Sequence, residues 1–107
     1  MKHIDKSQIP EIIKSDVPVL LELRSYECPA CIVAEKFLLV LEKAYANKLL
    51  FYIADVDDDL RQMFDITKVP QFVMFKKGKE VVRFSGFINE IEFEKKLREG
   101  LKTNGYV

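Results

Sequence analysis

Both cysteines of the chain stand in one short motif, Cys28-Pro29-Ala30-Cys31. The apolar run from Val17 to Leu23 before the motif is typical of a buried strand, and the sequence from Pro29 onward has the pattern of a long helix. Residues i and i+3 of a first helical turn lie roughly 5–6 Å apart, inside the window of about 4.4–6.8 Å between Cα atoms that a disulfide requires. We therefore expect the two sulfurs to bond or separate with little backbone movement.

The start of a helix also favours a negative charge, because its first N–H groups have no intrahelical partner and the helix dipole is positive there. We place Cys28 at the N-cap and Pro29 at the first helical position, where proline is tolerated. A thiolate on Cys28 would then face the free N–H groups of Ala30 and Cys31. This environment lowers the pKa of a cysteine in C-x-x-C motifs and makes it a better nucleophile near neutral pH.

Three other interpretations of the cysteine pair are open. A structural disulfide closing so short a loop contributes only about 2 kcal/mol, against about 4.7 kcal/mol for a hundred-residue loop. A structural zinc site needs four ligands, and the chain offers two cysteines and one distant histidine, His3, so we expect no metal. The third alternative is two unrelated buried thiols. Redox chemistry is the interpretation that we favour.

The overall composition narrows the class of protein. The 107 residues suit one domain spanning positions 1–107, and 17 basic residues balance 17 acidic ones. Nothing in this balance favours binding to nucleic acid or to an anionic membrane. No apolar run approaches the ~18 residues of a membrane span, and the start MKHIDKSQIPEIIK has no apolar secretory core. We therefore expect a cytoplasmic protein, and in that compartment a C-x-x-C motif is more often catalytic than structural.

Helices and strands alternate along the rest of the chain. We expect a short helix over Gln8–Lys14 capped by Ser7, a helix from Pro29 to Asn47, a strand from Leu49 to Val56, a helix through Phe64 capped by one of Asp57–Asp59, a hairpin of 69–75 and 80–84, and a last helix from Asn89. Apolar residues at helical spacing predict the inward face of the long helix: Val33, Phe37, Val40, Leu41 and Ala44. The inward face of the last helix is predicted to hold Ile91, Leu97 and Leu101. A hydrophobic staple of Ile88 and Phe93 is expected at the start of that last helix.

This order predicts an α/β fold with one mixed sheet. Strands that alternate with helices are parallel and joined by right-handed crossovers, and the hairpin adds an antiparallel edge. Helices cover both faces of such a sheet.

Glu22 is the anomaly of the first long strand, because it places a carboxylate inside a nearly continuous apolar run. An unpaired buried charge is costly, so the group either keeps its proton or points at water or a partner. Two interpretations stay open. Glu22 faces outward near the strand end, or it is a proton acceptor beneath the dithiol.

Taken together, these motifs resemble the thioredoxin family over nearly the whole chain. C-x-x-C opens a helix, Val69-Pro70 matches the family's cis-proline, the segment FKKGKEV at 75–81 matches its hairpin, and Gly86 matches its loop glycine. The resemblance implies the thioredoxin fold. It also implies site roles: Cys28 as attacking thiol, Cys31 as resolving thiol, Glu22 in place of the family's buried aspartate, and a substrate-binding surface of Val69, Pro70, Gly86, Pro29 and Ala30.

Several positions depart from the family pattern. Arg24 and Glu27 stand where thioredoxins carry tryptophans, Ile53 replaces the lysine that partners the buried acid, and Lys36 replaces a helix-kinking proline. Glu27 adds a negative charge beside the nucleophile, and Pro29 makes the motif similar to the C-P-x-C of glutaredoxins.

The resemblance implies a thiol–disulfide oxidoreductase that reduces protein disulfides in electron transport and cell redox homeostasis. It implies no bound cofactor beyond the redox-active Cys28–Cys31 disulfide, electrons from a flavoenzyme of the thioredoxin-reductase type, and a monomer that binds neither nucleic acid nor membrane. Two alternatives are a glutaredoxin-like protein reduced by glutathione and a non-catalytic module that uses the fold for binding.

Overall fold

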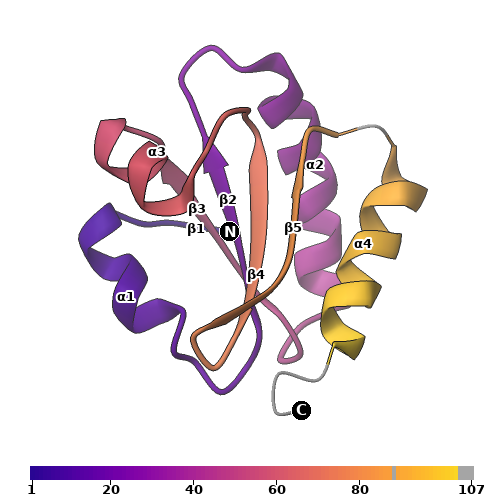
Figure 1. The fold of residues 1–107 in the computed structure, drawn as a ribbon. Helices are drawn as coiled ribbons and strands as arrows, with labels where there is room; N and C mark the ends of the chain where they lie inside the picture. Colours follow the sequence, from indigo (N-terminus) through magenta and orange to yellow (C-terminus); the bar gives the residue numbers. More distant parts are fainter. Residues whose placement is uncertain (88, 104–107) are drawn as a thin grey trace.

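The structure is a computed structural model that describes residues 1–87 and 89–103. Within these residues a central sheet lies between two layers of helices (Figure 1). The elements are β1 (Lys2–His3), a 3-10 helix (Lys6–Gln8), α1 (Ile9–Ile12), β2 (Val19–Arg24), α2 (Pro29–Ala44), β3 (Leu50–Asp55), α3 (Asp58–Phe64), β4 (Gln71–Lys76), β5 (Lys79–Ser85) and α4 (Glu90–Lys102).

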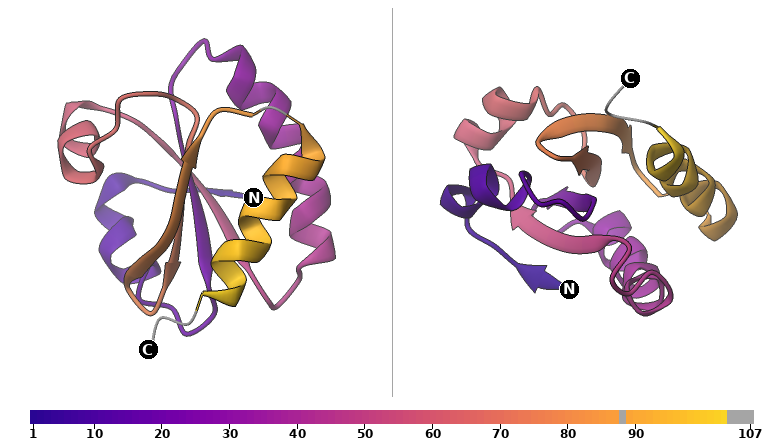
Figure 2. Two further views of the ribbon diagram at one scale, coloured as in Figure 1. Left: turned by 45° about the vertical axis from the view of Figure 1, so that its right-hand side comes forward. Right: turned by 90° about the horizontal axis from the view of Figure 1, so that it is seen from below.

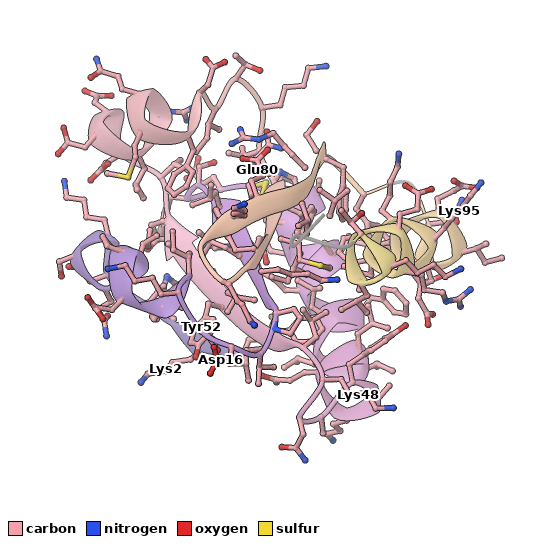
Figure 3. The ribbon with its side chains drawn as sticks, turned by 60° about the horizontal axis from the view of Figure 1, so that its bottom comes forward. Lys2, Asp16, Lys48, Tyr52, Glu80 and Lys95 are labelled. Atoms are coloured by element: carbon pink, nitrogen blue, oxygen red, sulfur yellow. A yellow bond between two sulfur atoms is a disulfide. The ribbon has the colours of Figure 1, made fainter. Side chains whose placement is uncertain are left out.

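The five strands of the described chain form one mixed sheet in the order β1-β3-β2-β4-β5. Strands β1, β3 and β2 are parallel, whereas β4 is antiparallel to β2 and pairs with β5 as a hairpin. Lys2 of β1 pairs with Tyr52 of β3, and Figure 3 shows the two residues close together at this outer edge. The predicted mixed sheet with helices on both faces is confirmed.

The helices lie on opposite sides of the sheet, α1 and α3 on one face and α2 and α4 on the other (Figure 2). Successive strand residues point to opposite faces, so Leu21 and Leu23 join the apolar cluster on the side of α1 and α3, and Leu20 joins the cluster on the side of α2 and α4. Glu22 shares the face of Leu20. The strand period alone therefore directs its carboxyl toward the layer that contains α2.

Side-chain caps begin the helices that flank the later strands. The Asp57 carboxylate accepts the Leu60 N–H (2.9 Å) at the start of α3, as expected for a residue of the acidic run. The Asn89 side chain accepts the Glu92 N–H (2.9 Å) and begins α4, which is also as predicted.

The first helical turn begins earlier than the sequence suggested. Asp5, not Ser7, caps it, and its carboxylate accepts the Ser7 N–H at 3.0 Å. The Asp5 carboxylate also accepts the Gln8 N–H, and the Gln8 side-chain oxygen accepts the Asp5 N–H, which completes a capping box. The prediction for Ser7 was wrong because a carboxylate two residues earlier is an equally good N-cap and also finds the reciprocal glutamine.

The buried face of α2 is rotated from the predicted one. Its buried residues are Cys31, Ala34, Leu38 and Leu41, and the helix ends at Ala44 rather than Asn47. Val33 and Val40 are 54% and 60% exposed. The prediction is confirmed for Leu41 and for the partly buried Phe37, and it was wrong for Val33, Val40 and Ala44, which are exposed. It was wrong there because α2 carries apolar residues on more than one side, so the 3.6-residue repeat does not by itself select the face that packs.

The predicted inward face of the last helix is correct in part. Leu97 is buried and Leu101 packs against the same cluster, as predicted, whereas Ile91 is 80% exposed. Phe93 packs edge-on against Phe72 and Phe84, with ring centroids 4.8 and 5.1 Å apart. Ile88, the other member of the predicted staple, lies outside the described residues. No helix in the described part of the chain is long and apolar enough to cross a membrane.

Candidate active site

The register of the sheet brings three loops to one end of the molecule. Leu23 at the end of β2 pairs with Gln71 at the start of β4, and Gln71 pairs with Ser85 at the end of β5. The loops before α2, before β4 and after β5 therefore lie at one end of the sheet (Figure 1, top). In the sequence, Cys28, Pro70 and Gly86 belong to these three loops. The Gly86 N–H donates a hydrogen bond to the Pro70 carbonyl (2.8 Å), which ties the two last loops together.

The two cysteines form a disulfide at the start of α2. Their Cα atoms are 5.2 Å apart, inside the expected window. Cys28 is the N-cap, and its Sγ accepts a hydrogen bond from the Cys31 N–H at 3.2 Å, as the sequence predicted. Cys28 is 7% exposed and Cys31 is 0% exposed. An incoming disulfide can therefore reach Cys28 more readily than Cys31.

The residues predicted to bind substrate lie around this junction. The Val69–Pro70 peptide bond is cis, as expected, with Val69 half-buried and Pro70 buried. Pro29 and Ala30 are exposed on the first turn of α2. Gly86 has φ +78°, and a Cβ there would meet nothing within 4 Å, so its backbone angle and not space favours glycine.

Glu22 is buried beside the Glu35 carboxyl. Its exposure is 1%, and neither carboxyl oxygen makes a hydrogen bond of acceptable geometry among the described residues. Burial raises the pKa of Glu22 to about 9; the nearby Glu35 carboxyl, as proton acceptor and as like charge, adds to the rise, and the Arg24 cation opposes it. The interpretation that Glu22 faces outward is therefore wrong, since this carboxyl lies inside and holds its proton at neutral pH.

Glu35 is the residue that sequence reasoning missed. One oxygen each of Glu22 and Glu35 and the Cys31 Sγ lie within 4.8 Å of one another. Glu35 follows Cys31 by four residues, so both point to the same side of α2. That spacing was the available signal, but it carries meaning only once the face of α2 that packs on the sheet is known.

Arg24 supplies the positive charge of this site. Its Nε lies 2.7 Å from Glu35 Oε2, and its guanidinium lies 3.6 Å from Asp55 Oδ1. Ile53, which stands at the position of the family's buried lysine, is beside Glu22 in the register of β2 and β3 and is only 8% exposed. The cation near the buried acid thus comes from β2 itself.

The cluster of two carboxyls and a sulfur also has the composition of a metal site. In this structure, however, Cys31 Sγ is bonded to Cys28, and the Arg24 guanidinium pairs with the Glu35 carboxylate. A cation would have to displace both partners. The arrangement is better suited to storing and moving a proton.

Comparison with known proteins agrees with the geometry. Residues 1–99 match the thioredoxin family, and the chain belongs to that family. It is 31% identical to thioredoxin of the rabbit, Oryctolagus cuniculus, over 104 residues that cover 92% of this chain and 97% of the relative.

Two further similarities extend this result. The chain is 23% identical to the chloroplastic Thioredoxin M3 of rice, Oryza sativa subsp. japonica, over 87% of its own length, and it spans about half the length of such chloroplastic relatives. A solved structure of Plasmodium falciparum thioredoxin superposes with a TM-score of 0.83 at 22% identity, covering 92% of this chain and 98% of that one. The fold is the thioredoxin fold.

Proposed function

We propose that this protein is a thiol–disulfide oxidoreductase that reduces protein disulfides through its Cys28–Cys31 couple. The observation that carries the proposal is the disulfide at the N-terminus of α2, in which Cys28 keeps 7% exposure and Cys31 is fully buried. A helix N-terminus stabilises the thiolate that exchange requires. The membership in the thioredoxin family supports the same chemistry.

The reaction takes two exchanges. The Cys28 thiolate attacks one sulfur of a substrate disulfide, a mixed disulfide forms, and the other substrate sulfur leaves as a thiolate. Cys31 then loses its proton and attacks Cys28 Sγ, so that the intramolecular disulfide forms and the second substrate sulfur leaves. Two electrons pass from the protein dithiol to the substrate, and two protons complete the substrate thiols.

Glu22 accepts the Cys31 proton in this proposal, because its carboxyl lies within 4.8 Å of Cys31 Sγ. The backbone of Val69 beside Pro70, together with Gly86, Pro29 and Ala30, forms the surface on which a substrate strand docks. The exposure of Pro29 and Ala30 and the bond between Gly86 and Pro70 support that grouping.

The proposal includes the setting of the protein. Residues 1–107 act as one domain and as a monomer, in the cytoplasm, where a dithiol can be kept reduced. A flavoenzyme of the thioredoxin-reductase type supplies electrons, no further cofactor is bound, and the role is in electron transport and cell redox homeostasis. Pro29 in the C-P-x-C motif favours one second candidate, a glutaredoxin-like protein reduced by glutathione.

Insulin reduction with dithiothreitol tests the activity. Wild-type protein is expected to accelerate the reaction, and Cys28→Ser is expected to abolish the acceleration. Wild-type protein that leaves the rate unchanged would identify a binding module instead. Supplying NADPH and a thioredoxin reductase in one reaction and glutathione in another then decides between the two electron donors.

Trapping tests the division of roles between the cysteines. Cys31→Ser is expected to accumulate mixed disulfides through Cys28, because the resolving step is lost, whereas Cys28→Ser accumulates few. Comparable yields from the two variants, measured on non-reducing gels, would show that the nucleophile is misassigned.

A further inference from the structure

A buried acid that already holds a proton is a poor proton acceptor. Glu22 is in this position near neutral pH, because burial and Glu35 both raise its pKa. Before Glu22 can take a proton from Cys31, it must transfer its own proton to another acceptor. The inference that follows rests on the proposed function, since it concerns how Cys31 is deprotonated during resolution.

The Glu35 carboxyl is placed to be that proton acceptor. It lies within 4.8 Å of both the Glu22 carboxyl and Cys31 Sγ. Its side chain is 21% exposed, whereas Glu22 is 1% exposed, so Glu35 reaches from the buried pair to water.

The place of Glu35 on α2 calls for an explanation of its own. The neighbouring stripe of the helix is formed by Cys31, Ala34, Leu38 and Leu41, all buried. A carboxylate beside such a stripe loses hydration that it would keep on the outer face. The ion pair with Arg24 compensates part of this cost, and the position also sets the carboxyl within 4.8 Å of Cys31 Sγ.

We propose that Glu22 and Glu35 form a two-carboxyl relay that carries the Cys31 proton to solvent, with Arg24 positioning the Glu35 carboxylate. The Glu22 proton moves to the Glu35 carboxylate, Glu22 takes the proton of the Cys31 thiol, and Glu35 gives its proton to water. One proton leaves the site, the carboxyl pair returns to its starting state, and Cys31 is left as the thiolate that attacks Cys28.

Arg24 is the positioning residue of this relay. Its Nε lies 2.7 Å from Glu35 Oε2, and its Nη1 lies 3.6 Å from Asp55 Oδ1 of β3. Asp55 in turn lies 3.1 Å from His3 Nε2 on β1. The charged or titratable groups around Glu22 are thus Arg24 from its own strand, Glu35 and Cys31 from α2, and Asp55 and His3 beyond Arg24.

Single-turnover kinetics of Glu35→Gln test the relay. The chain has no tryptophan, so the mixed disulfide is followed by rapid quenching, alkylation and intact-mass measurement. We expect resolution by Cys31 to slow about tenfold or more at pH 7, while attack by Cys28 keeps its rate. Glu99→Gln, an equal change of charge at an exposed position of α4, is the matched control and should keep both rates.

A double variant separates this inference from the proposed function. If the carboxyls act in series, Glu22→Gln with Glu35→Gln resolves no more slowly than Glu22→Gln alone. Slow resolution in Glu22→Gln but wild-type resolution in Glu35→Gln overturns the relay and leaves Glu22 as acceptor. If Glu22→Gln and Glu35→Gln each resolve the mixed disulfide at the wild-type rate, both the relay and the acceptor role of Glu22 are overturned. Insulin reduction that survives in Cys28→Ser overturns the proposed function itself.

NMR titration of the Glu22 carboxyl in the oxidised protein gives a readout that a purely structural role would not move. Loss of the like charge in Glu35→Gln should lower the pKa of Glu22, and loss of the cation in Arg24→Gln should raise it. Arg24→Lys, which keeps the charge, should restore most of the wild-type titration and part of the resolution rate. Unchanged titration in both Glu35→Gln and Arg24→Gln contradicts the relay.

Discussion

Glu22→Gln should stabilise the protein in a way that depends on pH. The carboxyl is 1% exposed, and its pKa rises from 4.5 to about 9 on folding, chiefly because of burial. Between these two values the unfolded chain has released the proton and the folded chain has kept it. Ionisation therefore favours the unfolded state, and the stability of the wild-type protein falls as the pH rises through this window. Glutamine carries no charge in either state.

The size of the effect follows from the same two values. A pH of 7 is 2.5 units above 4.5, the ordinary pKa of this carboxyl. Each unit corresponds to about 1.4 kcal/mol, so Glu22→Gln should raise the free energy of unfolding by on the order of 3 kcal/mol at this pH. At pH 4 both forms are protonated and the gain approaches zero. Above pH 9 the gain stops growing, because the folded state then ionises as well.

Urea unfolding followed by circular dichroism measures this difference. Both proteins are kept oxidised, so that no thiol titrates, and are unfolded at several pH values from 4 to 9. The free energy of unfolding of Glu22→Gln minus that of the wild type should grow steadily with pH. A difference that stays constant over this range would refute the assignment of a raised pKa to Glu22. Glu99→Gln, at an exposed position, should show no such trend.

Three further predictions concern the packing and caps that hold the site, each measured by urea unfolding at pH 7. Leu38→Ala should lower the free energy of unfolding by about 2–5 kcal/mol, because Leu38 is 1% exposed. Val40→Ala should change it by no more than about 0.5 kcal/mol, because Val40 is 60% exposed. Equal losses in the two variants would contradict the observed buried face of α2. Gly100→Ala should cost about 1–3 kcal/mol, since its Cβ would lie 2.7 Å from Met74 Sδ, and a more stable variant would contradict this contact. Asp57→Ala should cost about 1 kcal/mol by removing the cap of α3, and an unchanged midpoint would show that the cap contributes nothing.

Several features of the site were predictable from the sequence because they are local. The separation of Cys28 and Cys31 follows from one helical turn, and the capping roles of Asp57 and Asn89 follow from the residues next to them. The cis Val69–Pro70 bond was predicted by family resemblance and not by the local sequence. The strand that contains Glu22 was recognisable from its apolar run, and the period of two places every second residue on one face.

The tertiary structure decided the rotation of α2 and, with it, the chemistry next to Cys31. The helix has apolar residues on several sides, with Ile32, Val33, Leu39 and Val40 all at least half exposed, so its sequence is compatible with more than one buried face. Packing on the sheet selects the face of Cys31 and Leu38, and this choice turns Glu35 toward Glu22 and within reach of Arg24. The sequence determined that a dithiol begins a helix after an apolar strand that contains one acid, since those are properties of neighbouring residues. The second carboxyl and its cation joined that acid only through the docking of helix on strand, which depends on the whole core.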